Sequence, residues 1–147
     1  MALRDLTADE ISAFLESERV VRVAFAAGVE LFLAPMFYTW FDGAVCGLTT
    51  PGTKTRLAER SASVAFQVDS TVTSGIWEWT SVTGVGAWEV VTAAKEFGPF
   101  AAQLGERLSE QPEWTRTTLQ GRFRELGMVA WRIRPSRLGG KQSFAGV

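Results

Sequence analysis

The sequence contains no histidine and a single cysteine among its 147 residues. Without histidine the chain cannot form a Ser-His or Cys-His nucleophile pair, ligate haem through histidine, or build most catalytic zinc sites. Cys46 lies in an apolar run, where a buried structural thiol is expected because little nearby would lower its pKa. Any acid–base or redox chemistry therefore needs carboxylates, lysine, tyrosine or an organic cofactor.

Long apolar runs and an excess of one charge are also missing. Charged residues such as Arg22, Glu30 and Glu89 interrupt the longest apolar runs, so no segment is expected to span a membrane. The formal net charge is −1, and lysine and arginine are scattered, which argues against nucleic acid as a partner. The first residues, MALRDLTADE, lack the apolar core of a secretory signal, and a cytoplasmic protein is expected.

Apolar and aromatic residues, by contrast, are plentiful. Hydrophobic residues make up 46% of the chain and charged residues 21%, which is the composition of a globular protein rather than a disordered one. The length suits one domain with a real core, and no linker or repeat divides residues 1–147. Six tryptophans and ten phenylalanines can serve core and interface packing, or a surface on which a flat ring stacks.

Turn-linked strands dominate the predicted secondary structure. Alternating or β-branched segments predict six strands, at residues 19–26, 30–39, 44–49, 63–69, 77–91 and 127–134. Pro35 cannot donate to a strand ladder, so its strand is expected at an edge, at a bulge or facing a ligand. Gly84 and Gly86 are expected at bulges in the fifth strand. Because the strands do not alternate with helices, an antiparallel barrel is favoured over a doubly wound fold.

Helices are predicted between and around these strands, at residues 7–17, 53–60, 92–108 and 113–124. Thr7 and Glu10 form the capping box that begins the first helix. Gly98 and Pro99 are expected to interrupt the third. The glycine-rich tail, residues 138–147, is expected to cover a site or to fray.

The turn LTTPGTKT, residues 48–55, combines features that suit a phosphate. Thr49 and Thr50 end an apolar run, Gly52 lets the backbone approach a ligand closely, and Lys54 and Thr55 follow at once. Hydroxyl and N–H donors, a point charge and the absence of a bulky side chain are what a phosphate-binding turn requires. By themselves these residues would suit a nucleotide, a sugar phosphate or no ligand.

Five segments, taken in order, resemble the FMN-binding split-barrel family, which is the superfamily of pyridoxamine 5′-phosphate oxidase and its smaller relatives. The segments are RVVRVAFA, LAPMFYTWFDG, LTTPGTK, SVAFQVD and WTSVTGVG, and the resemblance extends from about residue 6 to residue 137. It implies a mainly β fold, a six-stranded antiparallel split barrel of Greek-key type with flanking helices. It also implies a homodimer with two FMN molecules in clefts between the subunits.

The resemblance further implies which residues contact FMN. The residue on the first strand would reach polar flavin atoms or phosphate, and the pair on the second strand would place backbone groups against the isoalloxazine ring. The threonines and lysine of the turn would bind the phosphate, and the pair on the fifth strand would lie near the polar edge of the ring. In that order the residues are Arg22; Pro35 and Met36; Thr49, Thr50, Lys54 and Thr55; Ser81 and Val82.

The chain also departs from the true oxidases of this family. Its tail, RIRPSRLGGKQSF, lacks their basic C-terminal motifs, and Thr53 and Lys54 stand where they have two basic residues. Oxidation of vitamin B6 and haem degradation are therefore not expected. The leading hypothesis is an FMN-dependent oxidoreductase with no metal, acting on a small molecule, with no catalytic acid or base assigned. A deazaflavin-dependent reductase, a non-catalytic flavin- or ligand-binding dimer, and a barrel without cofactor are the alternatives.

Overall fold

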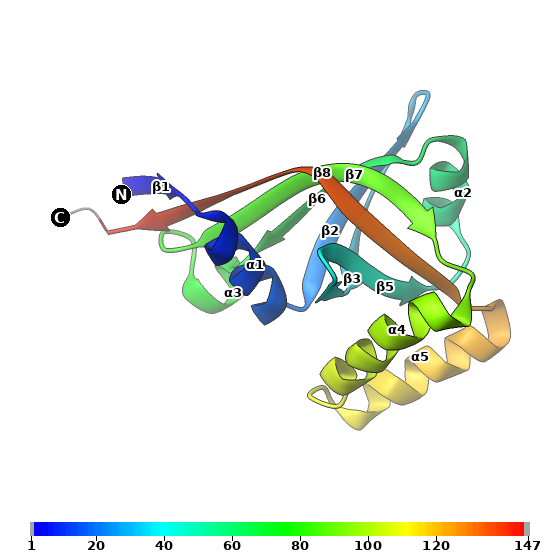
Figure 1. The fold of residues 1–147 in the computed structure, drawn as a ribbon. Coiled ribbons are helices and arrows are strands. Elements are labelled where there is room, and N and C mark those ends of the chain that lie inside the picture. Colours follow the sequence, from blue (N-terminus) through cyan, green and yellow to red (C-terminus); the bar gives the residue numbers. More distant parts are fainter. Residues whose placement is uncertain (1, 146–147) are drawn as a thin grey trace.

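The computed structural model describes residues 2–145 as a strongly curved antiparallel sheet with helices around it (Figure 1). Across these residues the sheet has eight strands: β1 (Ala2–Asp5), β2 (Val20–Ala27), β3 (Glu30–Phe37), β4 (Thr39–Phe41), β5 (Ala44–Thr49), β6 (Ser63–Asp69), β7 (Thr80–Val90) and β8 (Val129–Phe144). The helices are α1 (Ala8–Ser17), α2 (Thr53–Arg60), α3 (Thr71–Ser74), α4 (Ala94–Leu108) and α5 (Glu113–Leu126).

The connection between β3 and β4 explains why the sheet is curved. The strand order is β3-β2-β6-β7-β8-β5-β4, with β1 paired to the second half of β8. β3 and β4 are therefore at opposite ends of the path, yet Tyr38 alone separates them in the chain. One residue spans less than 4 Å and strands lie about 4.8 Å apart, so the sheet must curl until its two edges meet.

Aromatic side chains fill the inside of this curve. Trp88 stacks on Trp131 with ring centroids 4.8 Å apart, and Phe25 meets Trp88 edge-on at 5.1 Å. Helix α1 covers one end of the curve, where the Tyr38 hydroxyl donates a hydrogen bond to the Leu15 carbonyl at 2.7 Å. These contacts place the large apolar side chains away from water, which is the main stabilising term of the fold.

Helices α4 and α5 connect β7 to β8 and form a helical hairpin at the other end of the sheet (Figure 1). Phe100 and Leu104 of α4 are buried against Ala44 and Cys46 of β5. By contrast, none of the residues of α5, all of which the structure describes, is buried. The helical hairpin is therefore anchored to the sheet through α4 rather than through α5.

The strand count differs from the predicted six. β1 and β4 were not predicted because segments of four and three residues are too short to show alternation. Residues 77–79 precede β7 rather than forming part of it. The antiparallel split-barrel architecture with flanking helices is confirmed.

The last strand is much longer than predicted, because Pro135 does not end it. β8 continues to Phe144, and Ser136 is an extra residue opposite the Val85–Gly86 step. Proline is tolerated in a strand at such a bulge, since the ladder is already interrupted there. The tail predicted to cover a site or fray is thus strand through Phe144; residues 146 and 147 lie outside the described part of the chain.

Other local predictions have mixed outcomes. Pro35 lies on the edge strand β3, as expected, and Gly86 lies at a bulge. Gly84 does not; it leaves room for the ring of Phe66, which an added Cβ would strike. Helix α4 is continuous through Pro99, so the predicted interruption is wrong. Within residues 2–145, no helix is long and apolar enough to cross a lipid bilayer.

Candidate functional site

A groove of about 230 Å³ opens where the two edges of the curled sheet approach each other. We call it the β3–β5 groove. Strands β3 and β5 form its floor, α2 its near side, and the helical hairpin α4–α5 its far side. Its lining residues are Pro35, Met36, Phe37, Leu48, Thr49, Thr50, Lys54, Leu104, Leu108, Leu119, Arg122 and Phe123.

The threonines at the end of β5 are polar groups without partners. Thr49 and Thr50 are each 9% exposed, and their hydroxyls form no hydrogen bond with another residue among 2–145. Within the described part of the chain, the buried side-chain atoms without a partner are Trp88 Nε1 and Trp131 Nε1, so the two threonine hydroxyls remain open to water or a ligand. Both threonines line the groove, and a ligand there can supply their missing hydrogen bonds.

The turn after β5 is held by its own side chains. The Thr55 hydroxyl accepts a hydrogen bond from the Gly52 amide at 2.9 Å and donates one to the Gly52 carbonyl at 3.0 Å. Helix α2 begins immediately after this glycine, as predicted. Its first backbone N–H groups have no partner within the helix, and its positive dipole end favours an anion. Thr55 therefore shapes the turn and does not line the groove.

Lys54 extends into the groove from the first turn of α2. Burial lowers the pKa of its ammonium group, and the positive charge of Arg122 lowers it further. Neither Lys54 nor Arg122 forms an ion pair with another described residue, and no described acidic side chain lines the groove. The groove thus holds uncompensated positive charge, which is the electrostatic signature of an anion site.

A larger cavity of about 660 Å³ lies on the outer face of β2, β6, β7 and β8. We call it the sheet-face cavity. Small residues, including Ala24 and Ala65, line the cavity, and its surface is largely apolar. It adjoins the β3–β5 groove, because Arg22 at its rim is directly opposite Pro35 in the strand register. A ligand can extend from one opening to the other along this row.

Polar groups of the sheet-face cavity are mostly paired. Arg22 forms an ion pair with Asp69 at 3.2 Å. Gln67 donates a hydrogen bond to the Ser81 hydroxyl at 3.1 Å, on the same face of the sheet. Hydrogen bonds from Thr71 and the charge of Arg22 keep the pKa of Asp69 low although its burial acts in the opposite direction. Arg137 also lines the cavity, and its side chain has no ion pair or hydrogen bond with another described residue, so one of the two arginines of this region is free.

The predicted site residues thus fall into four groups. Five of them line the β3–β5 groove: Pro35, Met36, Thr49, Thr50 and Lys54. Thr55 supports the turn, and Arg22 and Ser81 lie beyond Pro35 on the outer sheet face. Val82 is fully buried in the core on a strand that is paired on both sides, so it lines neither opening.

The sequence prediction missed the helical side of the groove. Leu119, Arg122 and Phe123 of α5 come from a segment with no motif of its own, and Leu104 and Leu108 fit an ordinary apolar helix stripe. A weak signal did exist. Because α4 and α5 join two strands that pair with each other, their ends must return to the sheet beside Thr49, which pairs with Val129.

Other chemically active side chains are removed from ligands by burial. The tyrosine, Tyr38, is fully buried, and burial raises the pKa of its hydroxyl, so it packs in the core. Burial raises the pKa of the Cys46 thiol to about 12, which keeps it neutral and structural as predicted. Among residues 2–145, no cluster of acidic or sulfur ligands suited to a metal is present.

A family model described as pyridoxamine 5′-phosphate oxidase matches residues 7–142. The chain belongs to this family. The match includes both the groove-forming turn and the strands of the sheet-face cavity. It confirms the split-barrel family that the ordered sequence segments indicated. A comparison with curated proteins finds no significant match.

Solved structures with the family's fold are similar over nearly the whole chain. A FAD-binding protein from Mesorhizobium loti has 24% identity and a TM-score of 0.78, covering 98% of this chain and 100% of its own. The FAD binding protein from Mycobacterium smegmatis has 18% identity and a TM-score of 0.67, covering 94% and 98%. The heme storage protein HutZ from Vibrio cholerae has 15% identity and a TM-score of 0.70, covering 89% and 92%. At these identities the likeness concerns the fold.

Proposed function

We propose that this protein binds FMN and acts as a flavin-dependent oxidoreductase on a small-molecule substrate. The observation that carries the proposal is the β3–β5 groove. There Lys54 has no ion-pair partner, and the hydroxyls of Thr49 and Thr50 have no hydrogen-bond partner, among the described residues. A phosphate monoester would satisfy all three groups at once.

The rest of a flavin fits the neighbouring surface. The groove alone is smaller than the roughly 300–1,000 Å³ of an ordinary cofactor site, whereas the sheet-face cavity beside it measures about 660 Å³. With the phosphate in the groove, the ring would lie past Pro35 toward Arg22 and the largely apolar surface of the cavity. Gln67 and Ser81 would then offer polar atoms near the ring edge.

A second copy of the chain would complete this open site. The sheet-face cavity is open to solvent on one side, and the edge strand β3 beside it exposes apolar side chains, among them Leu31 at 79% and Leu33 at 64%. Exposed apolar residues on an unpaired edge strand mark an interaction surface. We therefore propose a homodimer in which each flavin is covered by the partner subunit.

The flavin, when bound, would supply the electron or hydride transfer. The chain's own residues would hold the phosphate, orient the ring on the outer sheet face and exclude water from it. No residue is assigned as a catalytic acid or base, because Tyr38 and Cys46 are buried and neutral. The substrate would meet the exposed face of the ring between the subunits.

The proposal is tested first by the absorption spectrum of the purified protein and by titration with FMN. Binding of FMN with flavin absorption in the visible is expected, and a colourless protein that FMN cannot titrate contradicts the proposal. Because two structural neighbours are described as FAD-binding, FAD and a deazaflavin are titrated in parallel. Tighter binding of either would replace FMN as the cofactor. Turnover of NAD(P)H with an electron acceptor then separates an enzyme from a flavin carrier.

A further inference from the structure

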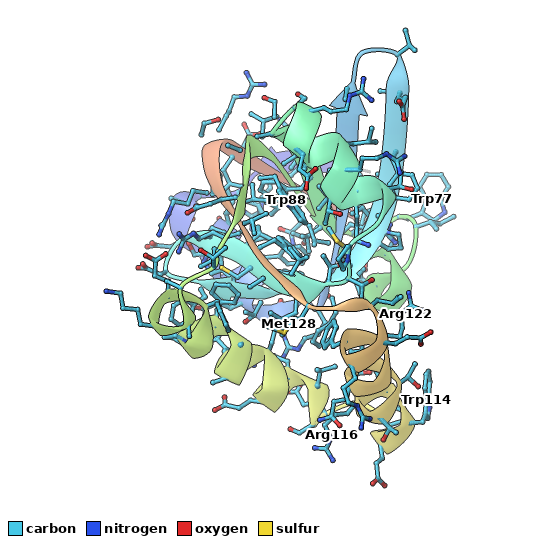
Figure 2. The ribbon with its side chains drawn as sticks, turned by 90° about the vertical axis from the view of Figure 1, so that its right-hand side faces the viewer. Trp77, Trp88, Trp114, Arg116, Arg122 and Met128 are labelled. Atoms are coloured by element: carbon cyan, nitrogen blue, oxygen red, sulfur yellow. The ribbon has the colours of Figure 1, made fainter. Side chains whose placement is uncertain are left out.

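The β3–β5 groove contains a second cation that no sequence motif predicted. Arg122 lies on α5, far along the chain from the turn that carries Lys54, yet both side chains line the same groove. Leu119, Arg122 and Phe123 share one face of α5, since residues three and four apart are neighbours on a helix. Figure 2 shows Arg122 near the end of α5 closest to the sheet, with Arg116 farther along the helix.

Lys54 and Arg122 line the same groove, and no carboxylate of a described residue neutralises their positive charges. Burial lowers the pKa of Lys54, and the positive charge of Arg122 lowers it further, which places the two cations within electrostatic reach of each other. Neither has a carboxylate partner among residues 2–145. Arg122 is exposed and lines the groove, and it forms no ion pair with Glu113 or Glu125 of its own helix. An arginine and a lysine that converge on two unpartnered hydroxyls form a cradle for a doubly charged anion.

We propose that Arg122 is a phosphate-binding residue, and that the phosphate of the ligand bridges helices α2 and α5 between Lys54 and Arg122. The ligand class is a phosphomonoester or a related dianion. Its identification as FMN rests on the proposed function, but the bridging anion site does not require a flavin. Lysine supplies a point charge, and the planar guanidinium supplies two parallel N–H donors.

The bridge would also hold α5 in place. None of the residues of α5 is buried, and its contact with the rest of the chain at the groove is through Leu119 and Phe123. A phosphate that binds Arg122 would connect this loosely packed helix to α2. The apolar residues on the same face would then close over the ligand, so binding and ordering of α5 are coupled.

The experiment compares Arg122→Gln with a matched control on the same helix. Arg124 is two residues away, which places it about 200° around the helix axis on the opposite face, and it does not line the groove. Wild type, Arg122→Gln and Arg124→Gln are each titrated with FMN and with riboflavin, which lacks the phosphate. Both arginines are exposed, so both variants are expected to fold.

The expected result is a loss that is specific to the phosphate. Arg122→Gln should weaken FMN binding about tenfold, the effect of one charge-assisted hydrogen bond, and leave riboflavin binding within twofold. Arg124→Gln should leave both unchanged. An Arg122→Gln variant that binds FMN as tightly as wild type would overturn the proposal. So would an equal loss for FMN and riboflavin, because Arg122 would then support the fold of the groove rather than the phosphate.

A second measurement separates this proposal from the proposed function. Inorganic phosphate should raise the unfolding temperature of wild type and of Arg124→Gln more than that of Arg122→Gln, because a ligand stabilises the state that binds it. If phosphate acts through Arg122 while FMN does not bind, the flavin assignment fails and the anion site stands. If FMN binds regardless of Arg122, only the anion bridge fails. If neither ligand binds, both proposals are wrong.

Hydrogen exchange gives an independent readout of the bridge. Phosphate or FMN should slow amide exchange in α5 of wild type, because the anion connects the helix to α2. The same ligands should have no such effect on α5 in Arg122→Gln. Protection of α5 that persists in the variant would show that the helix is ordered by other contacts and would contradict the bridge.

Discussion

The β3–β5 groove and the sheet-face cavity are neighbours on one surface, but they differ in size and in how their charges are compensated. The cavity is the larger, about 660 Å³ against about 230 Å³. Of its two arginines, Arg22 is paired with Asp69, whereas Arg137 has no partner among the described residues. In the smaller groove, Lys54 and Arg122 have no such partner among the described residues.

This difference shows that cavity size alone does not locate the charged end of a ligand. A paired cation has already exchanged its hydration for a carboxylate, so little is gained when another anion approaches. An unpaired, partly buried cation gains most from an anion, because its own burial is otherwise unfavourable. We therefore propose that the small groove, with two cations and two hydroxyls that lack partners among the described residues, binds the phosphate and that the larger cavity receives the ring.

The strongest test of this contrast is Lys54→Ala. We expect FMN binding to weaken by roughly 1.5–3 kcal/mol, about ten- to 150-fold, because a hydrogen bond to a charged group is lost. Binding of riboflavin should change little. The measurement is titration by flavin fluorescence. Lys95→Ala serves as the control, since Lys95 lines a different depression beside α4. Unchanged FMN affinity in Lys54→Ala would contradict the phosphate assignment.

Leu31→Lys tests whether a partner subunit covers the sheet-face cavity. Leu31 is 79% exposed on the edge strand β3. Burying a leucine in an interface contributes about 1.5–3 kcal/mol, so the charged variant should raise the dimer dissociation constant at least about tenfold. Sedimentation equilibrium measures the change. The control is Leu3→Lys on β1, where an equal effect would show that the weakening does not come from the β3 edge.

Arg22→Gln distinguishes the sheet-face cavity from the β3–β5 groove, because the variant's loss of affinity is compared between FMN and riboflavin. Because Asp69 already pairs with Arg22, we expect a smaller loss than for Lys54, about two- to fivefold. The loss should be equal for FMN and riboflavin, since Arg22 would face the ring and not the phosphate. The same titrations measure it. A loss confined to FMN would place the phosphate in the sheet-face cavity and reverse the assignment of the two regions.

Glu10→Gln tests how a carboxylate remote from the groove and the cavity contributes to the stability of the fold. It also shows the pH range in which the fold is stable enough for the binding experiments. The side chain of Arg4 and the Thr7 backbone amide donate hydrogen bonds to the Glu10 carboxylate and lower its pKa from 4.5 to about 2. A carboxylate with a lowered folded-state pKa stabilises the fold above its unfolded-state pKa. That contribution should fall as the pH decreases from about 4.5 to about 2 in wild type.

The variant should lack this part of the pH dependence, because glutamine does not titrate. Urea unfolding at several pH values measures the difference, and the effect should be small because the pair is exposed. FMN affinity at neutral pH should be the same in Glu10→Gln and wild type. A pH profile shared by both proteins would assign the acid sensitivity to other carboxylates.

Local sequence was sufficient for features that depend on neighbouring residues. The capping box of Thr7 and Glu10 forms as predicted, because its hydrogen bonds connect residues three apart. Helix α2 begins at Thr53 directly after Gly52, also as predicted. The edge position of Pro35 followed from its missing N–H. Each of these depends on backbone chemistry that a short window contains.

Predictions failed where a distant partner decides the local structure. β4 has three residues and becomes a strand only because β5 pairs with it. Pro135 would end an isolated strand, but the bulge opposite Gly86 accommodates it. Arg122 gave no signal because its importance depends on lying across a groove from Lys54. No window of sequence contains both residues.

Composition and hydrogen bonding within a few residues were enough to predict the excluded chemistries, the antiparallel strands and the polar turn between β5 and α2. Which cations lack a partner depends instead on the folding of distant segments. The curled sheet pairs Arg22 with Asp69 and leaves Lys54 facing Arg122. The physical reason is that the value of a charge to a ligand depends on its burial and its partners, and folding sets both.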